Sequence, residues 1–237
     1  MRNGHGRESI LLSKARWTAV DGLKIRYIED GQRSGPDLLM LAPARTGLTA
    51  FEPVWPAIAE TRRIVAIDPP GFGASGGRED LCAPRAMASF LIKAIDVFRL
   101  RHPHLAAADV LVASALFTAL EYPGAVESLI LSDGVLPPER RPTKDAQADA
   151  FEKGQTEAWS ELVAQLPQIT TPVLVLTTLQ DPSTPALSGL LSARLQRCRL
   201  ATLTGDLFEG ADAAPVCGNL IKAWIGGGYR SVALASP

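Results

Sequence analysis

The chain has 237 residues, of which 24 are lysine or arginine and 25 are aspartate or glutamate, for a formal net charge of −1. Hydrophobic residues make up 46% and charged residues 21%, a balance typical of a soluble globular protein that is long enough for one α/β domain. A near-neutral charge argues against nucleic acid or an anionic membrane as the main partner, because both require a basic surface.

Short apolar runs alternate with longer helical patterns, which predicts an α/β fold with a mainly parallel sheet. We expect a hairpin first, joining residues 13–20 to residues 24–29 through the turn pair Asp21-Gly22. The strands predicted after it are 38–41, 63–67, 104–108, 127–131, 173–177 and 199–203. The helices predicted between them are 52–60, 84–98, 110–122, 185–197 and 215–225.

Residues 135–169 depart from this alternation. They open on the polar, proline-rich stretch LPPERRPTKD and continue as one helical pattern over residues 146–166. We interpret this segment as a short helical cap over one end of the sheet, inserted in a single domain that spans residues 1–237.

Residues 71–76 match the pattern GxGxxG of a dinucleotide-binding loop, and they follow a predicted strand. However, Pro69 and Pro70 separate that strand from the glycines, and residues 77–80 continue as a loop where the motif requires a helix. The strand is also about the fourth of the sheet and not the first. We therefore interpret the segment as a tight glycine turn, and we expect no organic cofactor.

The cysteines are few and far apart, with no CxxC pair, so neither a disulfide framework nor a metal site is expected. Residues 1–10 lack the apolar stretch of a signal peptide, and no apolar run approaches the ~20 residues of a membrane span, which predicts a cytoplasmic protein with no membrane partner. The histidines of the sequence limit any chemistry that needs an imidazole base, because there are only three: His5, His102 and His104.

Three segments resemble, in order, the α/β-hydrolase superfamily. RRIVAIDPPGFGASG is similar to that family's fourth strand and the D-x-P-G-x-G-x-S turn after it. HPHLAAADVLVASALFTALEYPGAVESLILSDG resembles its fifth strand, nucleophile elbow, helix and sixth strand, and TPVLVLTTLQDPSTP resembles its seventh strand with the acid loop. The resemblance covers roughly residues 20–225. It implies the α/β-hydrolase fold, a mainly parallel eight-stranded sheet with helices on both faces.

The catalytic triad of the family does not carry over. Its nucleophile elbow is G-x-S-x-G, whereas the resemblance places residues 107–111 there, with Asp109 at the nucleophile position and Leu111 at the second glycine. Ser114 is too close to Pro123 for the intervening helix to fit, so we expect it inside that helix. Aspartate at the elbow occurs in the haloalkane dehalogenase and epoxide hydrolase branches, where the carboxylate forms an ester intermediate.

Those branches still require a histidine to activate water, which the family carries after its last strand. Here that segment reads LTGDLF, so Asp206 or Leu207 stands at the histidine position. His102 and His104 precede the fifth strand and should lie at the amino end of the sheet, whereas active sites of such folds lie at the carboxyl ends. We expect both to be solvent-facing or capping residues of a loop. His5 lies on an N-terminal arm.

Other acidic residues fall at positions that the family uses. Asp181 occupies its acid position, and Asp133 is the alternative acid, although a role in capping a neighbouring loop is favoured for Asp133. Together with Asp109 and Asp206, Asp181 would place several carboxylates at one rim of the sheet. Crowded carboxylates raise at least one pKa and keep one group protonated at neutral pH, which allows acid and base roles without histidine.

The family's oxyanion segment is also altered, because Ala42-Pro43 stands where the family has His-Gly. The amides of Ala44 and Val110 remain available to stabilise an oxyanion or enolate. Arg45 is either an exposed loop residue or a group that holds a substrate carboxylate. Three aromatic side chains are further candidates for lining the pocket, although such residues are as often part of the core: Phe51, Trp55 and Phe72.

Three functions fit this pattern. The first is a non-hydrolytic enzyme that moves a proton next to a carbonyl, as in epimerisation or isomerisation, which needs no water nucleophile. In its size, short cap and loss of serine and histidine the chain is similar to the bottromycin-pathway peptide epimerase, which implies a small-molecule or modified-peptide substrate from bacterial natural-product biosynthesis. The second is an aspartate-nucleophile hydrolase that uses Asp109. The third is a non-catalytic protein that binds a small molecule.

Overall fold

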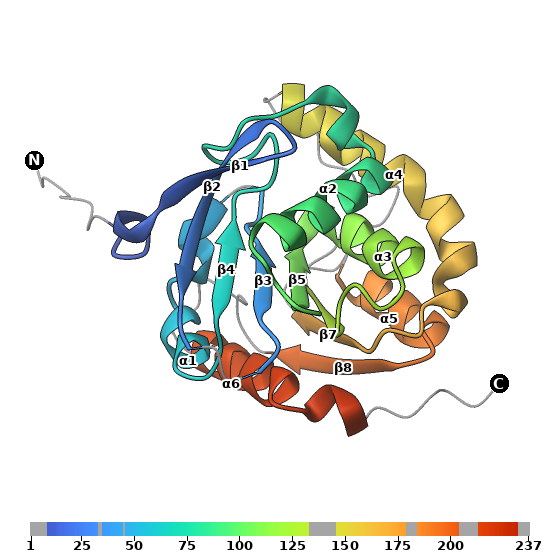
Figure 1. Ribbon diagram of the computed structural model, residues 1–237. Helices are drawn as coiled ribbons and strands as arrows, with labels where there is room; N and C mark the ends of the chain where they lie inside the picture. Colours follow the sequence, from blue (N-terminus) through green and yellow to red (C-terminus); the bar gives the residue numbers. More distant parts are fainter. Residues whose placement is uncertain are drawn as a thin grey trace, which may run out of the picture.

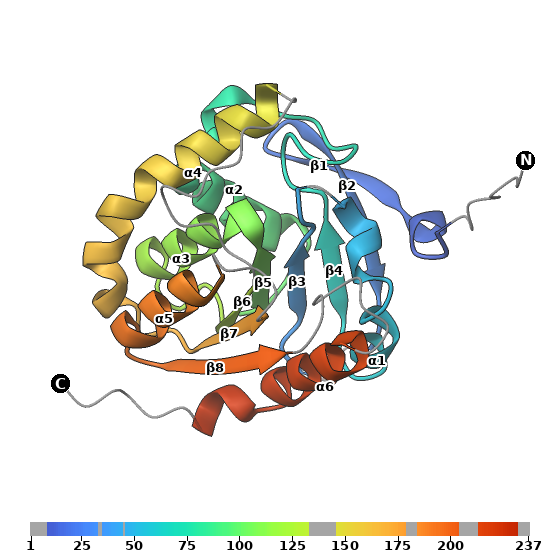
Figure 2. The same ribbon diagram turned by 180° about the vertical axis from the view of Figure 1, so that it is seen from behind.

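The computed structural model of the protein describes residues 9–32, 35–44, 46–132, 146–178, 184–203 and 213–231. In these residues eight strands form one sheet in the order β1-β2-β4-β3-β5-β6-β7-β8, and helices cover both of its faces (Figure 1, Figure 2). The β1–β2 and β2–β4 pairs are antiparallel, and every later pair is parallel. The predicted fold class is therefore confirmed.

The elements alternate along the chain as the sequence predicts. The strands are β1 (Arg16–Val20), β2 (Leu23–Asp30), β3 (Leu38–Leu41), β4 (Ile64–Ile67), β5 (His104–Ala108), β6 (Ser128–Ser132), β7 (Val173–Thr178) and β8 (Cys198–Leu203). The α-helices are α1 (Trp55–Ala59), α2 (Pro84–Val97), α3 (Val112–Glu121), α4 (Ala146–Gln165), α5 (Thr184–Arg194) and α6 (Ala213–Ile225). Short 3-10 helices are η1 (Leu12–Lys14), η2 (Gly47–Phe51), η3 (Glu79–Cys82), η4 (Asp109–Leu111), η5 (Leu166–Gln168) and η6 (Gly228–Ser231).

Several element boundaries differ from the prediction by two or three residues, and three of them lie at short turns. The first strand begins at Arg16 and not at residue 13, because residues 12–14 form η1. Helix α1 begins at Trp55 and not at residue 52, because residues 52–54 form turns after η2. Helix α3 begins at Val112 because the two residues before it belong to the turn η4. Each of these three differences is a short turn or 3-10 helix, which apolar periodicity does not distinguish from the neighbouring element.

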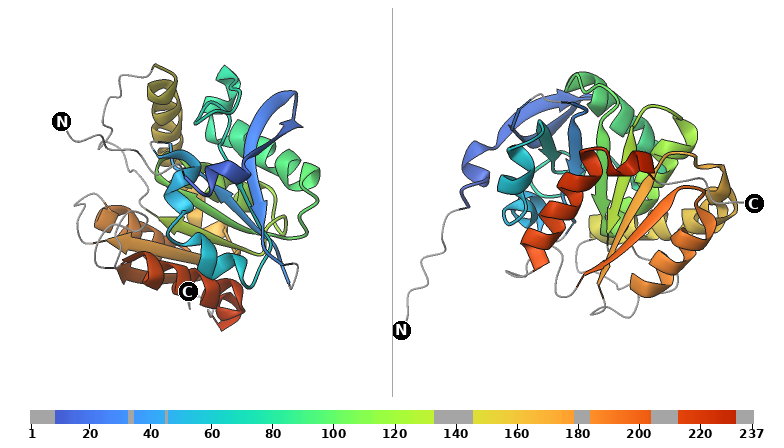
Figure 3. Two further views of the ribbon diagram at one scale, coloured as in Figure 1. Left: turned by 90° about the vertical axis from the view of Figure 1, so that its left-hand side faces the viewer. Right: turned by 90° about the horizontal axis from the view of Figure 1, so that it is seen from below.

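The core consists of two apolar layers, one on each face of the sheet. Alternate residues of β3 point to opposite layers, so that Leu39 and Leu41 belong to one cluster and Leu38 and Met40 to the other. Helices α2, α3, α4 and α5 contribute to the first layer, and α1 and α6 to the second (Figure 3). Because both faces are covered, β3 to β7 are buried along their whole length, as expected for a parallel sheet.

Helix α4 belongs to the segment that the sequence analysis interprets as a cap. Its Trp159 and Leu162 are buried in the layer of α2 and α3, and the helix contacts α3, η3 and η4. At Gly154 it crosses so close to η3 that a Cβ atom would lie 2.5 Å from the carbonyl oxygen of Cys82. This part of α4 is thus packed into the body of the domain. Residues 133–145 lie outside the described part of the chain, so the cap itself stays a prediction.

The glycine-rich turn after β4 is built around a buried carboxylate. Asp68 is fully buried, and its Oδ2 accepts hydrogen bonds from Nε of Arg26 at 2.5 Å and from the amide of Ala74 at 3.1 Å. The Ser75 hydroxyl donates to the Asp68 carbonyl and accepts from the Arg26 amide, which ties the turn to β2. Gly73 has a φ of +56°, and a Cβ there would lie 2.3 Å from the Asp68 carboxyl carbon. These contacts hold the glycine-rich segment as a tight turn over the buried Asp68–Arg26 ion pair.

This close approach can be tested by comparing Gly73→Ala with Gly124→Ala. Both glycines have left-handed backbones, but nothing lies within 4 Å of a Cβ built at Gly124. We expect Gly124→Ala to cost about 1 kcal/mol of unfolding free energy through the backbone alone. Gly73→Ala should cost at least about 2 kcal/mol more, because Asp68 has to move. Urea denaturation measures both values, and equal losses would contradict the assignment.

His104 is the first residue of β5 and is fully buried at the amino end of the sheet. Its Nδ1 lies 2.7 Å from Oγ of Ser128, which also accepts a hydrogen bond from Nε1 of Trp224 at 2.7 Å. The expectation of a solvent-facing or loop-capping residue is therefore wrong for His104, because α6 and η6 fold back over this end of the strand. It holds for His102, which is exposed and precedes the strand.

Burial lowers the pKa of His104 to about 4, with Arg62 and Arg230 acting in the same direction and Glu127 against it. Above pH 6.5 the imidazole is neutral in both folded and unfolded chains, whereas between pH 6.5 and 4 only the unfolded chain takes up the proton. Folding stability should therefore fall as the pH drops through this range, by about 3 kcal/mol from this group.

The comparison of the wild type with His104→Leu isolates this effect, because acidic groups elsewhere contribute equally to both proteins. Between pH 7 and pH 4 we expect the wild type to lose about 3 kcal/mol more unfolding free energy than the variant. Urea denaturation at several pH values measures the difference. Parallel pH curves for the two proteins would show that His104 does not titrate in this way.

Candidate active site

Asp109 lies at the sharp turn between the central strand β5 and helix α3. The strand ends at Ala108, and the single turn η4 leads directly into the helix. Asp109 has a φ of +56°, a left-handed conformation that is costly for residues other than glycine and less so for Asp and Asn. A strand, a strained residue and a helix in succession are the geometry of a nucleophile elbow. The structure thus places Asp109 where the resemblance predicts it.

Apolar packing holds this turn in place. Ala107 and Ala108 are nearly fully buried, and Leu111, which replaces the second glycine of the family pattern, is completely buried in the layer of α2 and α3. The Leu111 side chain is therefore accommodated by packing into the core. Ser114 is a buried residue inside α3, as the sequence predicts.

The two described histidines lie at the opposite end of the sheet from the elbow. His104 begins β5 and pairs in register with Leu38, the first residue of β3, whereas Asp109 follows the end of the same strand. The five residues of β5 separate the two positions by about 16 Å at the usual rise of a strand. Neither His104 nor the preceding His102 can reach the elbow. His5 lies outside the described residues.

Several predicted site residues also lie outside the described part of the chain. Asp181 follows the carboxyl end of β7, and Asp206 follows that of β8. Arg45 comes after β3, and Asp133 comes after β6. The last residues of β6 and β7, Ser132 and Thr178, are placed by parallel register at the same edge of the sheet as Ala108. The roles assigned to these four residues stay predictions.

Two backbone segments reach this edge beside Asp109. Val110 is in the first turn after β5, where backbone N–H groups have no partner within the helix. Ala44 follows the neighbouring strand β3 in a turn that closes when the Gly47 amide donates to the Pro43 carbonyl at 2.9 Å. Because β3 and β5 are adjacent, the two segments lie at the same edge of the sheet. The oxyanion role assigned to the two amides stays a prediction.

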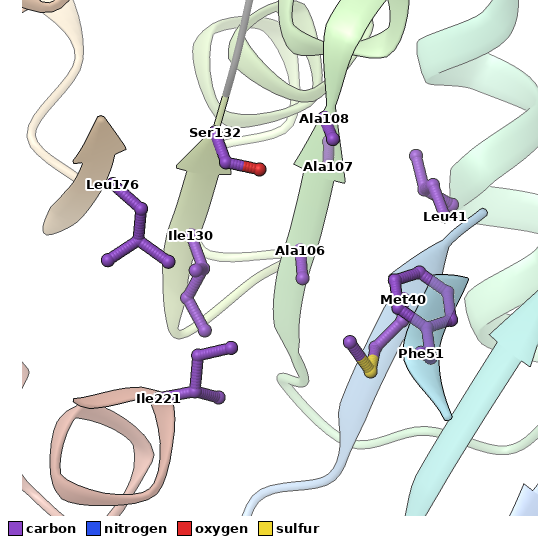
Figure 4. Close-up of a pocket in the computed structure, with 10 residues that line it drawn as sticks. All are labelled: Met40, Leu41, Phe51, Ala106, Ala107, Ala108, Ile130, Ser132, Leu176 and Ile221. Atoms are coloured by element: carbon purple, nitrogen blue, oxygen red, sulfur yellow. The ribbon is translucent and has the colours of Figure 1, made fainter. Parts of the chain in front are cut away.

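An apolar cavity lies directly under the elbow, between the carboxyl halves of β3, β5, β6 and β7 (Figure 4). Its lining includes Ala106, Ala107 and Ala108, the last of which precedes Asp109. Its one polar side chain is Ser132, at the end of β6. The main apolar side chains that line it are Met40, Phe51, Ala106, Ile130, Leu176 and Ile221.

The three predicted aromatic residues occupy different places. Phe51 lines the cavity under the elbow. Trp55 lies on α1, where its Nε1 donates to Oδ2 of Asp30 at 3.3 Å, and Phe72 packs in the layer of α2 and α3. The substrate-binding roles of all three stay predictions. Ser132 was missed because a serine that ends an apolar strand run looks like an ordinary strand terminus.

Among the described residues, no group of three or more histidine, cysteine, aspartate or glutamate side chains is arranged to bind a metal ion. Within the same ranges, no helix has both the length and the apolar character needed to cross a membrane. The three cysteines are free thiols, and burial raises the pKa of Cys198 to about 11.

The left-handed backbone of Asp109 can be tested with Asp109→Ala and Asp109→Gly. Both variants remove the carboxylate and all of its contacts, and only glycine is free of strain at a positive φ. We expect the glycine variant to be more stable than the alanine variant by about 1 kcal/mol. Chemical denaturation of the pair measures the difference. An alanine variant of equal or greater stability would show that the residue does not adopt the elbow conformation.

No protein-family model and no curated protein matches this chain. Solved structures do match over nearly its whole length. Haloalkane dehalogenase DbeA from Bradyrhizobium elkani USDA94 is 20% identical with a TM-score of 0.70, and the match covers 90% of this chain and 97% of that one. Cfl2 from Burkholderia cenocepacia is 21% identical with a TM-score of 0.69, over 91% of this chain and 95% of that one. A bacterial membrane phospholipase A is 19% identical with a TM-score of 0.69, over 92% and 87%. The chain therefore has the α/β-hydrolase fold.

Proposed function

We propose that the protein is a non-hydrolytic enzyme that transfers a proton at the carbon next to a carbonyl group, and that it epimerises or isomerises a peptide-like substrate from bacterial natural-product biosynthesis. One observation carries this proposal. The carboxylate of Asp109 stands at the nucleophile elbow, while no histidine follows His104 in the sequence and His104 is buried at the other end of β5. The site therefore offers a carboxylate base without the imidazole that hydrolysis in this fold uses.

The chemistry follows from the groups at this edge. The carboxylate takes the proton from the carbon next to the carbonyl, and negative charge develops on the carbonyl oxygen as an enolate forms. The amides of Ala44 and Val110 donate hydrogen bonds to that oxygen, which is the main source of stabilisation in such a step. Return of a proton to the opposite face of the carbon completes an epimerisation. The predicted carboxyl groups of Asp181 and Asp206 are the candidates for that acid.

An aspartate-nucleophile hydrolase is the alternative, favoured by the position of Asp109 and by the haloalkane dehalogenases among the similar structures. In this function the carboxylate would displace a halide or open an epoxide to form an ester, which water must then cleave. Displacement of a halide needs only Asp109 as the nucleophile, whereas opening of an epoxide also needs an acid that protonates the epoxide oxygen. The second step needs a base to activate water, and the sequence places no histidine after β5 to supply it.

Proton transfer can be measured as deuterium uptake from D₂O at the Cα of N-acetylated amino-acid amides, followed by mass spectrometry. We expect uptake with the wild type and a loss of at least about 100-fold with Asp109→Asn, because a positioned base contributes that much. Asp96→Asn is the matched control, since Asp96 is exposed on α2, away from this edge. Absence of uptake with the wild type, or equal uptake with Asp109→Asn, would overturn the proposal.

The alternatives give different results in a companion experiment. After incubation with an epoxide or haloalkane, an ester adduct on Asp109 in the intact mass spectrum would favour the hydrolase. Tight binding of the amides without deuterium uptake or an adduct would favour a non-catalytic binding protein.

A further inference from the structure

The guanidinium group of Arg26 on β2 uses only part of its hydrogen-bonding capacity. Its Nε donates to Oδ2 of the fully buried Asp68 at 2.5 Å. Within the described part of the chain the side chain makes no other hydrogen bond, so Nη1 and Nη2 have no partner there. The side chain is 21% exposed, and neither of these two nitrogen atoms is buried. Arg26 therefore presents a pair of N–H donors in the fork geometry that matches a carboxylate.

Arg26 lies at the carboxyl end of the sheet, the same end as Asp109. The pairing of β2 with β4 stops one residue before it, and the amide of Asp68, directly after β4, donates to the Arg26 carbonyl at 3.0 Å. The β1–β2 hairpin continues beyond this point (Figure 1). Gly47 lies beside the ion pair, because a Cβ built there would be 4.0 Å from Nη2 of Arg26. The unpaired donors are thus next to the segment after β3, which carries Ala44.

The face of β2 around these donors is positively charged. Lys24 is two residues before Arg26, so both side chains are on the same face of the strand. Lys24 is exposed, its Nζ lies 4.3 Å from the centre of the Trp17 ring, and no carboxylate of the described ranges pairs with it. Asp68 balances one of the two positive charges. These three groups therefore carry one net positive charge, which attracts an anion.

The ion pair between Arg26 and Asp68 is incomplete as a purely structural contact. Asp68 is fully buried, and among the described residues its Oδ1 has no hydrogen-bond partner. A buried charge whose hydrogen bonds are only partly satisfied costs stability. The pair does, however, fix the guanidinium in one orientation while Nη1 and Nη2 stay free. A donor that is held in place in this way loses less conformational entropy when an anion binds to it.

We propose that Arg26 binds a carboxylate group of the substrate in a bidentate contact through Nη1 and Nη2. This inference rests on the proposed function, which supplies a peptide-like substrate and places the reaction at Asp109. Strand order puts Arg26 three strand spacings from Asp109, or about 14 Å. In an extended peptide that distance corresponds to about four residues. The substrate is then a peptide with a terminal or side-chain carboxylate about four residues from the reacting residue.

Binding can be measured without turnover by isothermal titration calorimetry. The probes are N-acetyl-pentaalanine with a free C-terminal carboxylate, the corresponding C-terminal amide, and an amide in which glutamate replaces the last alanine. We expect the free acid to bind at least about tenfold more tightly than the pentaalanine amide, because charge-assisted hydrogen bonds are strong. If the glutamate peptide binds as tightly as the free acid, the site also holds side-chain carboxylates. If it binds only as weakly as the amide, the site holds the chain terminus.

Arg26→Lys separates carboxylate binding from the ion pair. Lysine keeps a positive charge beside Asp68 but lacks the forked donors, so the preference for the free acid should fall to within about twofold. Arg16→Lys is the matched control and should keep the full preference. Arg16 is exposed on β1, and it lies on the face opposite to Arg26 because the next residue, Trp17, is the register partner of Arg26. Thermal unfolding shows whether each variant is folded.

Lys24→Ala gives a second test at an exposed position that leaves the ion pair intact. It should weaken binding of the free acid by about twofold to threefold and leave binding of the pentaalanine amide unchanged, because it removes only a nearby charge. The weakening should disappear at high salt, which screens such a charge. Equal effects on the acid and on the amide would contradict a carboxylate site on this face.

The outcomes separate this inference from the function on which it rests. Absence of binding by the free acid, or a preference that survives in Arg26→Lys, would overturn the site. Loss of the preference in Arg45→Lys but not in Arg26→Lys would also overturn it, because Arg45 would then hold the carboxylate. Deuterium uptake that is equal for the acid and the amide, with no difference in binding, would overturn the site while the proposed function stood. A preference lost in Arg26→Lys, without deuterium uptake, would support the site and contradict the proposed function.

Discussion

The site depends on one backbone constraint, the left-handed conformation of Asp109 between β5 and α3. At this point the chain leaves the central strand of a sheet that is covered on both faces, and it must turn at once into a buried helix. The buried side chains of Ala108 and Leu111 on either side stabilise that turn and offset its local cost. As a consequence, a carboxylate stands at the edge of the sheet, beside the amides of the segments after β3 and β5.

The polar residues at the amino end of the sheet differ in their environment from those at the carboxyl end. At the amino end, His104 is packed among Ser128, Trp224 and Tyr229, and its ring contacts Tyr229 edge-on at a centroid distance of 5.2 Å. On the same end, the buried Arg63 binds carboxylates of β2 and of the segment before β3, Glu29 at 2.7 Å and Asp37 at 2.9 Å. These hydrogen bonds and ion pairs join distant parts of the chain. The carboxyl end instead carries Asp109 in its strained left-handed conformation, a feature that suits a functional site better than stability.

Much of this arrangement could be predicted from the sequence, because fully buried parallel strands and amphipathic helices leave distinct apolar patterns. The elbow position of Asp109 was implied by the resemblance of the segment around β5 and α3 to the α/β-hydrolase pattern. The burial of His104 could not be predicted, since it depends on Trp224 and η6, more than 100 residues later in the chain. The orientation of Trp55 likewise depends on a hydrogen bond to Asp30 in another element. The position of Ser132 beside the elbow could not be predicted either, because it depends on the pairing of β6 with β5.

The central claim is that Asp109 moves a proton and does not form a covalent ester. The most direct measurement is one reaction of the wild-type enzyme with a peptide-like substrate in D₂¹⁸O, followed by mass spectrometry of the product and of the peptide that contains Asp109. Proton transfer predicts deuterium at the substrate Cα and no ¹⁸O in either the product or the Asp109 carboxylate. Incorporation of ¹⁸O into the Asp109 carboxylate would show that an ester had formed there and been hydrolysed, and it would contradict this account.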